Sequence, residues 1–461
     1  MKVCVVGTGY VGLTTGASLA FLGHEVTCLD LDHAKIEMLR RGRSPIYEPF
    51  LEDLLAEAGD RLRFTADYTE GVGGADVVFI AVQTPSLPDG SPDLRFLRKA
   101  AASVGQSVDG AFTVVVNKST VPIGSGNWVD AILRESFEEL HGRRADGEFA
   151  VASNPEFLRE GSAIHDTLYP DRIVIGSDDP RSLEVLNRLY RPILDQSFTP
   201  PSFLARPDGV GAVALVATDL ASAELIKYAA NAFLALKISY INEIGRLAGK
   251  VGADIIQVAR GTGLDARIGS RFLQPGVGWG GSCFGKDTAA LIATAEEYHH
   301  DMPIVRAARE VNERQREAVV DKLLDELQII KGRKIGLLGL AFKPQTDDLR
   351  DAPAIHIAER LIARGARVKL HDPVAAERFR TEQPELAPFL ADTVDEVFDD
   401  SDAVVLVTEW SQYLELDWAK FVGLMRTPVL LDGRHALDPA RLTQLGYRYL
   451  SMAGRSTPPA S

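Results

Sequence analysis

The chain begins with apolar runs that alternate with a glycine turn and a helical stretch. Residues 2–30, KVCVVGTGYVGLTTGASLAFLGHEVTCLD, contain an apolar run, a glycine turn, a stretch with helical periodicity and a second apolar run that ends at Asp30. Short continuous apolar runs are typical of strands buried on both faces, as in parallel sheets. The pattern therefore predicts a βαβ unit over these residues.

The same alternation continues through the first 180 residues. Further strand-like runs occur in ADVVFIAVQTP, FTVVVNKSTVP, FAVASNPEF and RIVIGS, with helical patterns between several of them, for example around residues 93–104 and 126–140. Strands that alternate with helices in this way predict a doubly wound, mostly parallel sheet. The stretch that follows, residues 197–215, is long for a connection and suggests no function.

The opening pattern returns in the last third of the chain. GRKIGLLGLAFK is followed by a helical stretch, by ARVKLHDP and later by SDAVVLVTEW, which resembles ADVVFIAVQTP in the first half. We therefore expect an α/β protein with two Rossmann-like, doubly wound parallel-sheet domains. The tail, SMAGRSTPPAS, has little to bury and is expected to be disordered.

A long helical pattern separates the two halves. Residues 218–252 contain no glycine or proline before Gly245, and Thr218 or Asp219 can cap the start. About 30 helical residues span about 45 Å. Because apolar positions lie on more than one face, we expect a long central helix that joins the domains and packs against its copy in a second subunit.

The composition narrows the classes of partner. The formal net charge of -14 argues against a polyanion such as nucleic acid, whereas an anionic small molecule is compatible if lysine and arginine side chains gather locally. No apolar run reaches the roughly 18 to 20 residues of a membrane span, and we expect a cytoplasmic protein. The three cysteines, Cys4, Cys28 and Cys283, match neither a disulfide framework nor a metal-binding spacing.

The motif GTGYVG follows the first predicted strand and opens the first predicted helix. Here Gly7 permits the turn, Gly9 lets backbone N–H groups approach a pyrophosphate, and Gly12 allows the helix to pack closely. Asp30 ends the next strand, where its carboxylate would bind the ribose hydroxyls and repel a 2′-phosphate. The motif therefore predicts NAD rather than NADP as the cofactor. Lys35 could line the adenosine or be solvated like most helix lysines.

The second half lacks this turn. Gly339, Ala341 and Pro344 stand where the first half has its three glycines. Lys343 occupies the place where a dinucleotide would need open backbone, so we expect the second half to bind a diphosphate through side-chain charge.

Cys283 lies in the glycine-dense stretch PGVGWGGSCFGKD, just before a segment with helical periodicity. The N-terminus of a helix lowers the pKa of a thiol, and the glycines would let a substrate approach the sulfur. Asp287 follows one turn later and could serve the reaction or only stabilise the helix end. Cys4 and Cys28 lie in strand-like runs, where a small buried side chain is the simpler interpretation.

Other polar residues occupy positions that suit chemistry. Lys227 and Asn231 share one face of the long helix in an otherwise apolar run, so their burial would demand a partner or a purpose. Glu156 and Glu160, in NPEFLREG, follow a predicted strand of the first domain, where α/β sheets place their sites.

The stretch STVP also ends a predicted strand. The hydroxyls of Ser119 and Thr120 either lie near the cofactor's reactive end or bond a local turn, and the turn is the simpler interpretation.

An NAD site and a nucleophilic cysteine together define a specific chemistry. Oxidation of an alcohol gives an aldehyde, which a thiolate can capture as a thiohemiacetal. Loss of a second hydride gives a thioester that water opens, so one site could take an alcohol to an acid over four electrons.

These motifs resemble the UDP-glucose/GDP-mannose dehydrogenase family. GTGYVG, STVP, NPEFLREG, ELIKYAANAFLALKISYINE, RIGSRFLQPGVGWGGSCFGKD, GLAFKPQTDDLRDAP and LDGR occur in the order and spacing of its UDP-glucose 6-dehydrogenases, and the resemblance covers nearly the whole chain. It implies NAD-dependent oxidation of UDP-glucose at C6 to UDP-glucuronate, through thiohemiacetal and thioester intermediates on Cys283. Dehydrogenases of GDP-mannose or UDP-N-acetylmannosamine remain the alternative.

The resemblance also implies roles for individual residues. Cys283 would be the nucleophile, Lys227 and Asn231 would stabilise oxyanions, Asp287, Thr120 and a water would move protons, and Glu156 would assist thioester hydrolysis. Further cofactor contacts are expected at Tyr10, Val11, Thr84, Thr120, Glu160, Lys286 and Arg350. Substrate contacts are expected at Glu156, Phe157, Leu158, Lys227, Asn231, Arg267, Phe272, Gly280, Lys343 and Arg434, with Arg267 reaching across from a partner subunit. Trp279 stands where phenylalanine or tyrosine is common.

The pattern and the resemblance together divide the chain into four segments. We expect an NAD-binding Rossmann domain over residues 1–210, a central helical and dimerisation domain with the cysteine loop over 211–312, a UDP-sugar-binding Rossmann-like domain over 313–450, and the tail over 451–461. UDP-glucose would be the small-molecule substrate. The expected assembly is a homodimer through the central helix, or a higher oligomer built on it, with neither nucleic acid nor membrane as a partner.

Overall fold

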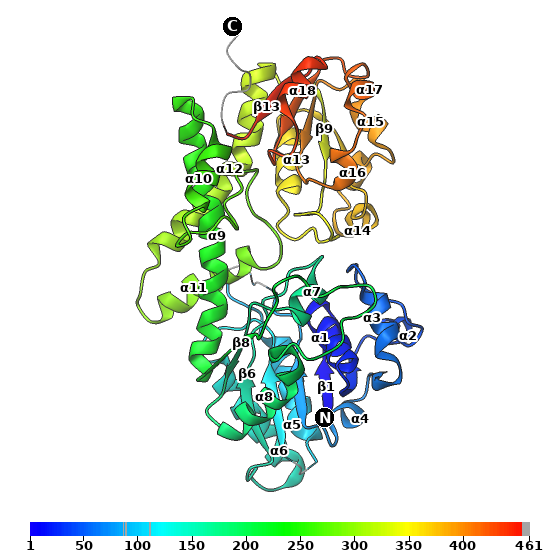
Figure 1. The fold of residues 1–461 in the computed structure, drawn as a ribbon, viewed down its shortest axis with the longest axis vertical. Helices are drawn as coiled ribbons and strands as arrows, with labels where there is room; N and C mark the ends of the chain where they lie inside the picture. The colour runs from blue at the N-terminus through cyan, green and yellow to red at the C-terminus, as the bar shows by residue number, and fades with distance from the viewer. Residues whose placement is uncertain (86, 88–89, 110–111, 454–461) are drawn as a thin grey trace. The chain divides into compact units, whose positions relative to one another are not determined.

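The computed structural model describes residues 1–85, 87, 90–109 and 112–453. The chain forms two compact units, of which unit 1 comprises Met1–Ala230 with Ala289–Tyr298, and unit 2 comprises Asn231–Thr288 with His299–Ser461. Two helices, α9 (Leu220–Val251) and α11 (Phe284–Glu297), contribute residues to both units (Figure 1). The expected central domain is therefore divided between the two units.

Unit 1 is built on an eight-stranded sheet in the order β3-β2-β1-β4-β5-β6-β7-β8. Neighbouring strands are parallel except for β6 and β7, which are antiparallel. The strands are β1 (Lys2–Val6), β2 (Glu25–Leu29), β3 (Leu62–Thr65), β4 (Val77–Ile80), β5 (Thr113–Asn117), β6 (Phe149–Ser153), β7 (Arg172–Gly176) and β8 (Ala214–Thr218). Every residue of β4, β5 and β6 is buried, which is why their sequences read as continuous apolar runs.

Side chains on the two faces of this sheet belong to two separate cores. Along β1, Val3 and Val5 join one core while Cys4 and Val6 join the other, as the alternation of a strand requires. The helices that cover these faces are α1 (Tyr10–Phe21), α2 (His33–Arg40), α3 (Leu51–Ala58), α4 (Tyr68–Val72), α5 (Arg95–Ser107), α6 (Ser125–His141), α7 (Ala163–Leu168) and α8 (Pro180–Leu194). One short 3-10 turn, Gly59–Arg61, precedes β3.

Unit 2 contains a five-stranded, all-parallel sheet in the order β10-β9-β11-β12-β13. Its strands are β9 (Lys334–Leu338), β10 (Arg367–His371), β11 (Ala403–Leu406), β12 (Val429–Asp432) and β13 (Arg448–Ser451). The accompanying helices are α13 (Pro353–Ala363), α14 (Ala376–Glu382), α15 (Val394–Phe398), α16 (Ser411–Leu414), α17 (Trp418–Val422) and α18 (Pro439–Gln444), with a 3-10 turn at Ala387–Phe389. Two doubly wound, mostly parallel sheets are therefore present, as the sequence predicts.

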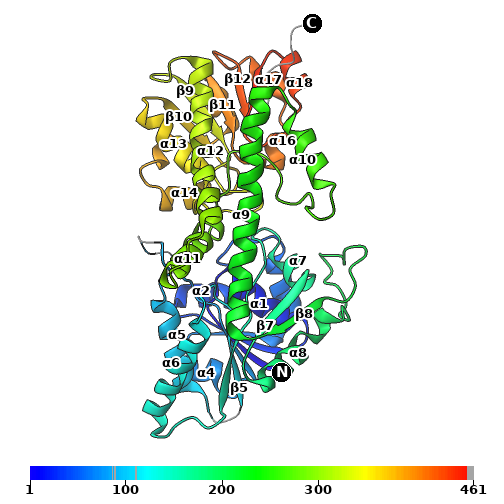
Figure 2. The same ribbon diagram turned by 90° about the vertical axis from the view of Figure 1, so that its left-hand side faces the viewer.

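The long helix predicted between the two halves is α9, with 32 residues. Its C-terminal half packs in unit 2 against α10 (Ile255–Gly263) through Ile241 and Ala248, and Ser239 Oγ donates to the carbonyl of Ala308 in α12 (Pro303–Leu327) (Figure 2). No helix among the described residues is both long and apolar enough to cross a lipid bilayer.

Residues 197–215 run over the helical layer of unit 1 before they form the edge strand β8. Phe198 contacts Phe21 at the end of α1, and Phe203 stacks on Phe50 at the start of α3 with ring centroids 5.6 Å apart. Ser202 donates to the carboxylate of Glu57 through its backbone and its hydroxyl. The stretch therefore covers apolar surface and completes the sheet.

The first residues of the tail are ordered, contrary to expectation. Ser451 ends β13, and Met452 and Ala453 are 3% and 7% exposed. Ala453 packs against Gly245 of α9, where a Cβ would lie 2.8 Å from the alanine methyl group. The expected disorder is therefore wrong for residues 451–453, while 454–461 lie outside the described residues.

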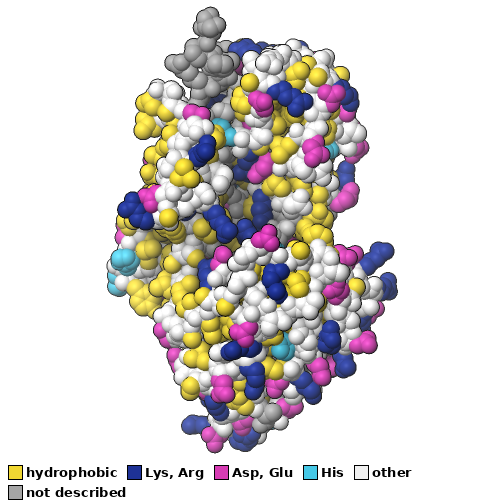
Figure 3. Space-filling model, viewed as in Figure 1, with side chains coloured by type: hydrophobic (Ala, Val, Ile, Leu, Met, Phe, Trp, Pro, Cys, Tyr) yellow, Lys and Arg dark blue, Asp and Glu magenta, His cyan; other side chains and the backbone are white. Residues whose placement is uncertain are grey.

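Acidic and basic side chains are interspersed over the face of the molecule in Figure 3.

Candidate active site

The glycine turn after β1 has the geometry expected of a pyrophosphate-binding turn. Gly7 has φ +102°, and a Cβ there would lie 2.6 Å from the carbonyl oxygen of Ala81. A Cβ at Gly12 would lie 1.9 Å from the carbonyl oxygen of Gly7, whereas one at Gly9 would meet nothing within 4 Å. Gly7 and Gly12 are needed for packing, and Gly9 leaves open space at the start of α1, where Tyr10 and Val11 begin the helix.

Asp30, at the end of β2, is held as an ionised carboxylate. Its Oδ2 accepts hydrogen bonds from the backbone N–H and the hydroxyl of Thr8, at 2.9 and 2.6 Å, and its Oδ1 accepts from the N–H of Asp32. Burial opposes ionisation, but these hydrogen bonds and the charge of Lys35 hold the pKa of Asp30 below its usual range. A half-buried anion beside the glycine turn suits ribose hydroxyls and repels an added phosphate.

Hydroxyl residues follow β4 and β5 in unit 1. Ser119 Oγ donates to the carbonyl of Val82 at 2.7 Å, 37 residues earlier in the chain, so the expected bond to a local turn is wrong and the hydroxyl links the end of β5 to that of β4. Thr84 Oγ1 donates to the carbonyl of Thr120 at 2.9 Å, which ties the two strand ends together. Thr120 itself is half-buried.

Lys227 and Glu156 form a buried ion pair in unit 1. Lys227 Nζ lies 2.9 Å from Glu156 Oε1 and donates to the carbonyl oxygen of the same residue at 2.6 Å. The two side chains are 4% and 7% exposed. Glu156 Oε2 accepts from the N–H of Leu158, and Lys227 Nζ lies 5.3 Å from the centre of the Phe157 ring. The first residues of NPEFLREG thus surround the ammonium group.

A second buried lysine, which the sequence analysis missed, lies in this cluster. Lys118 is 8% exposed and donates to Oδ1 and the carbonyl of Asn154, at 3.0 and 3.3 Å. Burial lowers the pKa of Lys118 to about 8, with the charge of Glu156 opposing the shift and that of Lys227 adding to it. The signal in the sequence was a lysine directly after the strand-like run TVVVN.

Glu48, also missed, holds the far end of the same loop. Its carboxylate accepts from the N–H groups of Gly161 and Ala163, both at 2.7 Å, at the start of α7. Glu160 lies beside this contact and is half-buried. Nothing in the local sequence around Glu48 indicates a partner more than a hundred residues away.

The three cysteines differ sharply in exposure. Cys4 and Cys28 are 0% exposed in β1 and β2, and burial raises the pKa of both thiols. Cys283 is partly exposed and directly precedes α11, as predicted for a nucleophile at a helix N-terminus. Its sulfur lies 3.5 Å from Ser282 Oγ.

Asp287 and Asn231 form a second buried polar pair, in unit 2. Asn231 Nδ2 donates to Asp287 Oδ2 at 2.6 Å, and Asp287 is 0% exposed. Lys286 Nζ lies 2.8 Å from Asp287 Oδ1, so the expected cofactor ligand Lys286 is here an ion-pair partner. The N–H of Asp287 donates to the carbonyl of Cys283, which fixes the carboxylate one turn after the thiol.

Helix α9 carries one member of each pair. Lys227 and Asn231 are four residues apart in this helix, and both side chains are buried. The expectation that these polar groups need partners is therefore confirmed for both.

In unit 2, basic residues from two loops lie close together. Lys343 follows β9 and lies 5.5 Å from the centre of the Phe342 ring. Arg434 donates to the carbonyl oxygens of Val407 and Phe342, at 2.6 and 3.2 Å. Arg434 also lies 3.5 Å from the place of a Cβ at Gly276, so its guanidinium borders the start of the cysteine loop.

The remaining predicted residues are spread over unit 2. Phe272 has φ +64° and meets the ring of Phe284 edge to face, close to the thiol. A Cβ at Gly280 would lie 2.2 Å from the carbonyl oxygen of Asp351. Arg267 is 89% exposed and pairs with Asp265, while Arg350 pairs with Asp348, so neither guanidinium lies in these clusters.

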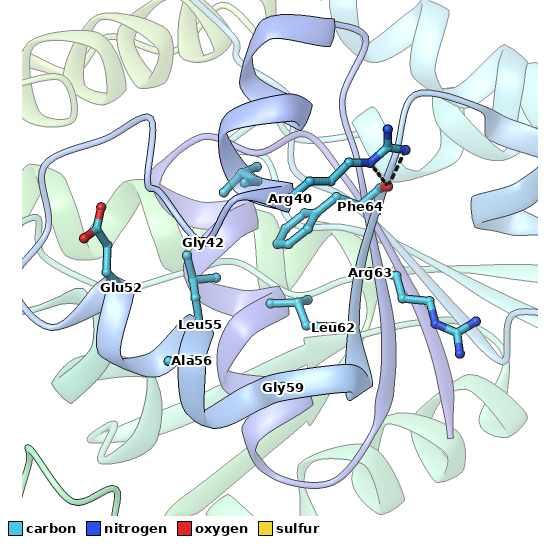
Figure 4. Close-up of a pocket in the computed structure, with 10 residues that line it drawn as sticks. Arg40, Gly42, Glu52, Leu55, Ala56, Gly59, Leu62, Arg63 and Phe64 are labelled. Carbon is cyan, nitrogen blue, oxygen red and sulfur yellow. Dashed lines mark hydrogen bonds between the residues drawn. The ribbon is translucent and has the colours of Figure 1, made fainter.

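A hollow of about 400 Å³ opens at the edge of the first sheet (Figure 4). It is lined by residues of α2, α3 and β3, and the guanidinium of Arg40 donates there to the carbonyl oxygen of Phe64. None of the predicted site residues lines it.

Three family models match successive parts of the chain. Residues 1–194 match the NAD binding domain of the UDP-glucose/GDP-mannose dehydrogenase family, residues 221–314 its central domain, and residues 336–439 its UDP binding domain. The chain belongs to this family.

Full-length relatives support the assignment. The chain is 43% identical over 462 residues to the UDP-glucose 6-dehydrogenase YwqF of Bacillus subtilis, covering 100% of this chain and 99% of that one. It is 45% identical over 456 residues to a UDP-glucose 6-dehydrogenase of Pseudomonas aeruginosa, covering 97% and 96%. The structure of a UDP-glucose dehydrogenase from Pyrobaculum islandicum matches with a TM-score of 0.86 and 39% identity, over 98% of each chain.

As a member of this family of dehydrogenases, the chain uses NAD, and unit 1 fits that cofactor. Gly9 leaves room for a pyrophosphate at the start of α1, and the ionised Asp30 stands where the ribose hydroxyls would bind. When bound, NAD supplies a hydride acceptor.

We expect Asp30→Ser to weaken discrimination between the two nicotinamide cofactors. Loss of the carboxylate removes an acceptor for the ribose hydroxyls and the repulsion of a 2′-phosphate, so the KM for NAD should rise about tenfold while activity with NADP increases. Initial rates with each cofactor measure both effects. Unchanged discrimination would show that Asp30 does not face the ribose.

The buried Lys118 should make stability depend on pH. The pKa of Lys118 is lower in the folded state than the usual 10.5, so above about pH 8 the folded protein binds fewer protons than the unfolded chain. The free energy of unfolding should therefore rise with pH in this range. Relative to Lys118→Met, the wild-type protein should gain about 1 kcal/mol between pH 7 and pH 9. Denaturant unfolding at the two pH values, followed by circular dichroism, measures the difference.

Lys99→Met is the control, because Lys99 is an exposed lysine of α5. It should show no such dependence. A Lys118→Met variant that parallels the wild-type protein at both pH values would mean that Lys118 titrates normally.

Proposed function

We propose that the chain oxidises UDP-glucose at C6 to UDP-glucuronate, with two molecules of NAD and a covalent intermediate on Cys283. One observation carries the proposal: the partly exposed Cys283 begins α11 one turn before the fully buried Asp287, which Asn231 holds. A non-catalytic scaffold protein would be expected to have lost this nucleophile loop, whereas Cys283, Lys227 and Asp287 are all present. The identity of 43–45% to UDP-glucose 6-dehydrogenases favours this sugar over GDP-mannose or UDP-N-acetylmannosamine.

We propose that Cys283 receives the aldehyde formed by the first oxidation. In that oxidation the C6 hydroxyl gives up its proton and C6 gives up a hydride, and Asp287, Thr120 and a water take part in moving the proton. The thiolate then adds to the carbonyl carbon, so that a C–S bond forms and the electron pair moves to oxygen. Lys227 and Asn231 stabilise the resulting oxyanion by charge and hydrogen bonding.

The second half of the reaction releases the acid. The thiohemiacetal loses a second hydride from C6 and a proton from oxygen, which gives a thioester. Water attacks this carbon with Glu156 as its base, the C–S bond breaks, and the thiolate returns. Overall, one alcohol, two NAD⁺ and one water become one carboxylate, two NADH and three protons.

The buried ion pair gives the ammonium group of Lys227 a counter-charge. Burying an ammonium group in an apolar helix face is costly unless an anion compensates for the lost water. Glu156 supplies that anion at 2.9 Å. The same contact holds Glu156 near the group on which it would act.

Binding of the nucleoside diphosphate is proposed for the second unit. Lys343 and Arg434 would bind the diphosphate and the nucleotide, because both belong to the unit whose sheet lacks the pyrophosphate turn and Arg434 stands beside the cysteine loop. Leu158, Phe157, Phe272 and Gly280 would contact the sugar. Arg350 would lie near the nicotinamide, after release from Asp348. We also propose a cytoplasmic location, which the acidic composition and the reduced thiol chemistry favour.

The Cys283→Ser variant tests the covalent step. A serine hydroxyl is a far weaker nucleophile, so the wild-type yield of two NADH per UDP-glucose should fall to at most one, and UDP-glucuronate formation should drop by at least about 1000-fold. Absorbance at the NADH band and separation of the nucleotide sugars measure both. Full UDP-glucuronate production by this variant contradicts the thioester. A wild-type preference for another nucleotide sugar in a competition assay contradicts the substrate.

We also propose a homodimer formed through α9. Large apolar side chains stand exposed along one side of this helix, with Phe233, Tyr240 and Leu247 spaced by seven residues and 60%, 49% and 55% exposed. A seven-residue repeat is typical of a seam between two helices, and a two-fold axis would bring the same stripe against itself. Each side chain of this size contributes about 1.5–3 kcal/mol when buried. The exposed Arg267 would then be free to reach a partner subunit.

The Phe233→Glu variant should be monomeric at micromolar concentration, because it places a charge in the proposed seam, on its most exposed side chain. Sedimentation velocity measures the assembly. Leu140→Glu is the matched control, since Leu140 of α6 is 61% exposed and lies outside the stripe. A Phe233→Glu protein that sediments like the wild-type protein would exclude α9 as the interface.

A further inference from the structure

The loop that carries Cys283, residues 275–287, is held by side chains of α9 and α12 in unit 2. The N–H of Gly276 donates to Asn242 Oδ1 and the N–H of Trp279 donates to Asn312 Oδ1, both at 2.8 Å. Asn312 Nδ2 donates back to the carbonyl of Trp279 at 2.9 Å, and Gln315 Nε2 donates to the carbonyl of Gly276 at 2.7 Å. These three amide side chains are at most 2% exposed.

The indole of Trp279 adds a further anchor. Its Nε1–H donates to Ser239 Oγ at 3.0 Å, and Ser239 donates to the carbonyl of Ala308. Phenylalanine cannot make this bond, and tyrosine would carry its donor at a different place. The loop backbone is therefore fixed by several buried hydrogen bonds, each made in surroundings from which water is excluded.

Arg316 of α12 extends this network to a second loop. Its Nη2 donates to the carbonyl of Trp279 at 2.8 Å and to the carbonyl of Asp351 at 3.1 Å, while Nη1 lies 2.7 Å from Asp351 Oδ1. Arg316 is 8% exposed. One buried guanidinium thus joins the cysteine loop to residues 341–352, the loop that also carries Lys343.

Asp351 is fitted closely to the cysteine loop. It has φ +51°, a strained value for aspartate, and its carbonyl oxygen lies 2.2 Å from the place of a Cβ at Gly280. Desolvation opposes ionisation of Asp351, but hydrogen bonds from His356 and Arg316 hold its pKa below the usual range. The N–H of Gly281 donates to the carbonyl of Arg350 at 2.9 Å, so the two loops meet at several points.

A fixed loop is what the chemistry demands of a glycine-rich segment. Glycines 276, 278, 280 and 281 pack so closely against neighbouring parts of unit 2 that a Cβ at any of them would clash, so the expected room for a substrate is not found there. They also leave the free loop with many conformations. A thiolate attacks only from a narrow range of positions, and a displacement of about 1 Å lowers the rate about 100-fold. The neighbours of the loop must therefore remove the freedom that the glycines introduce.

We propose that Arg316 is a positioning residue that locks the cysteine loop to the 341–352 loop, so that a nucleoside diphosphate held at Lys343 determines the orientation of Cys283. Arg316 acts through the carbonyl of Trp279 and through Asp351, and it does not touch the substrate. The coupling part rests on the proposed function, because it requires the diphosphate to bind at Lys343.

The first test compares Arg316→Met with the wild-type protein in steady-state kinetics. The variant keeps the length and the apolar stem of the side chain but loses the three donated contacts. We expect kcat to fall about 100-fold while the KM for NAD, a property of unit 1, changes less than twofold. Arg316→Lys should recover part of the loss, because it keeps a charge opposite Asp351.

Arg314→Met is the matched control on the same helix, since Arg314 is 65% exposed and pairs only with Glu310 among the contacts found for its side chain in the described residues. It should behave as the wild-type protein does. A kcat of Arg316→Met within twofold of the wild-type value overturns the proposal. If Arg316→Met does not fold, Asp351→Asn, which weakens one of the three contacts, must lower kcat with unchanged KM for NAD, and failure to do so overturns it equally.

The second test does not depend on the sugar. Alkylation of Cys283 by iodoacetamide is followed by mass spectrometry, with and without UDP. The quantity compared is the ratio of the alkylation rates with and without UDP. In the wild-type protein this ratio should differ from one at least threefold. In Arg316→Met it should be about one, although calorimetry still detects UDP binding. A wild-type ratio of one, or a ratio unchanged in the variant, overturns the coupling. Another outcome is that UDP changes the alkylation rate in the wild-type protein but not in Arg316→Met, while the wild-type protein does not oxidise UDP-glucose. In that case the proposed substrate is wrong and the lock between the two loops stands.

Discussion

Ionised groups removed from water must be paired, and this constraint organises the chemistry of the chain. Breaking one buried pair costs about 3–5 kcal/mol, a large part of the stability of most folded domains. Lys227 has Glu156, and Asp287 has Lys286 and the amide of Asn231. Each pair therefore fixes the segment on which its partners stand, namely NPEFLREG, the start of α11 and the middle of α9.

The same constraint explains why the reactive groups lie on rigid elements while the backbone around them is rich in glycine. Gly9 leaves open space for a cofactor to approach the backbone, whereas Gly280 lets the carbonyl of Asp351 pack against the cysteine loop. Rigidity must then come from neighbours whose polar groups reach the backbone. Glu48 performs this role at Gly161, and the amides of α9 and α12 perform it at the cysteine loop.

Features that depend on a few neighbouring residues could be predicted from the sequence. The role of each of these features was inferred from an adjoining element: a helix for the glycine turn and Cys283, and a strand end for Asp30. The alternation of strands and helices is visible in the apolar runs. The burial of Lys227 and Asn231 was also inferable, because both interrupt an apolar helix. The family resemblance added roles that the local pattern left open.

Features that depend on distant partners could not be predicted in this way. Asn312, Gln315 and Arg316 read as an ordinary solvated helix face in VNERQR, and only the folded chain brings Trp279 and Gly276 against them. Lys118 is buried because its ammonium group donates to Asn154, which lies 36 residues further along the chain. Ala453 is likewise buried against α9, because Gly245 leaves room for its methyl group. This contact joins residues far apart in the sequence, so no local pattern indicates it.

The continuity of α9 limits how this chain can change during evolution. Helical residues advance by about 100° each, so one residue inserted between Lys227 and Asn231 would turn everything after it away from the side that Lys227 faces. Point substitutions on the outer side leave this phase intact, whereas length changes do not. Insertions and deletions should therefore be tolerated better before the helix, in residues 197–215. A change of length there does not alter the spacing between Lys227 and Asn231.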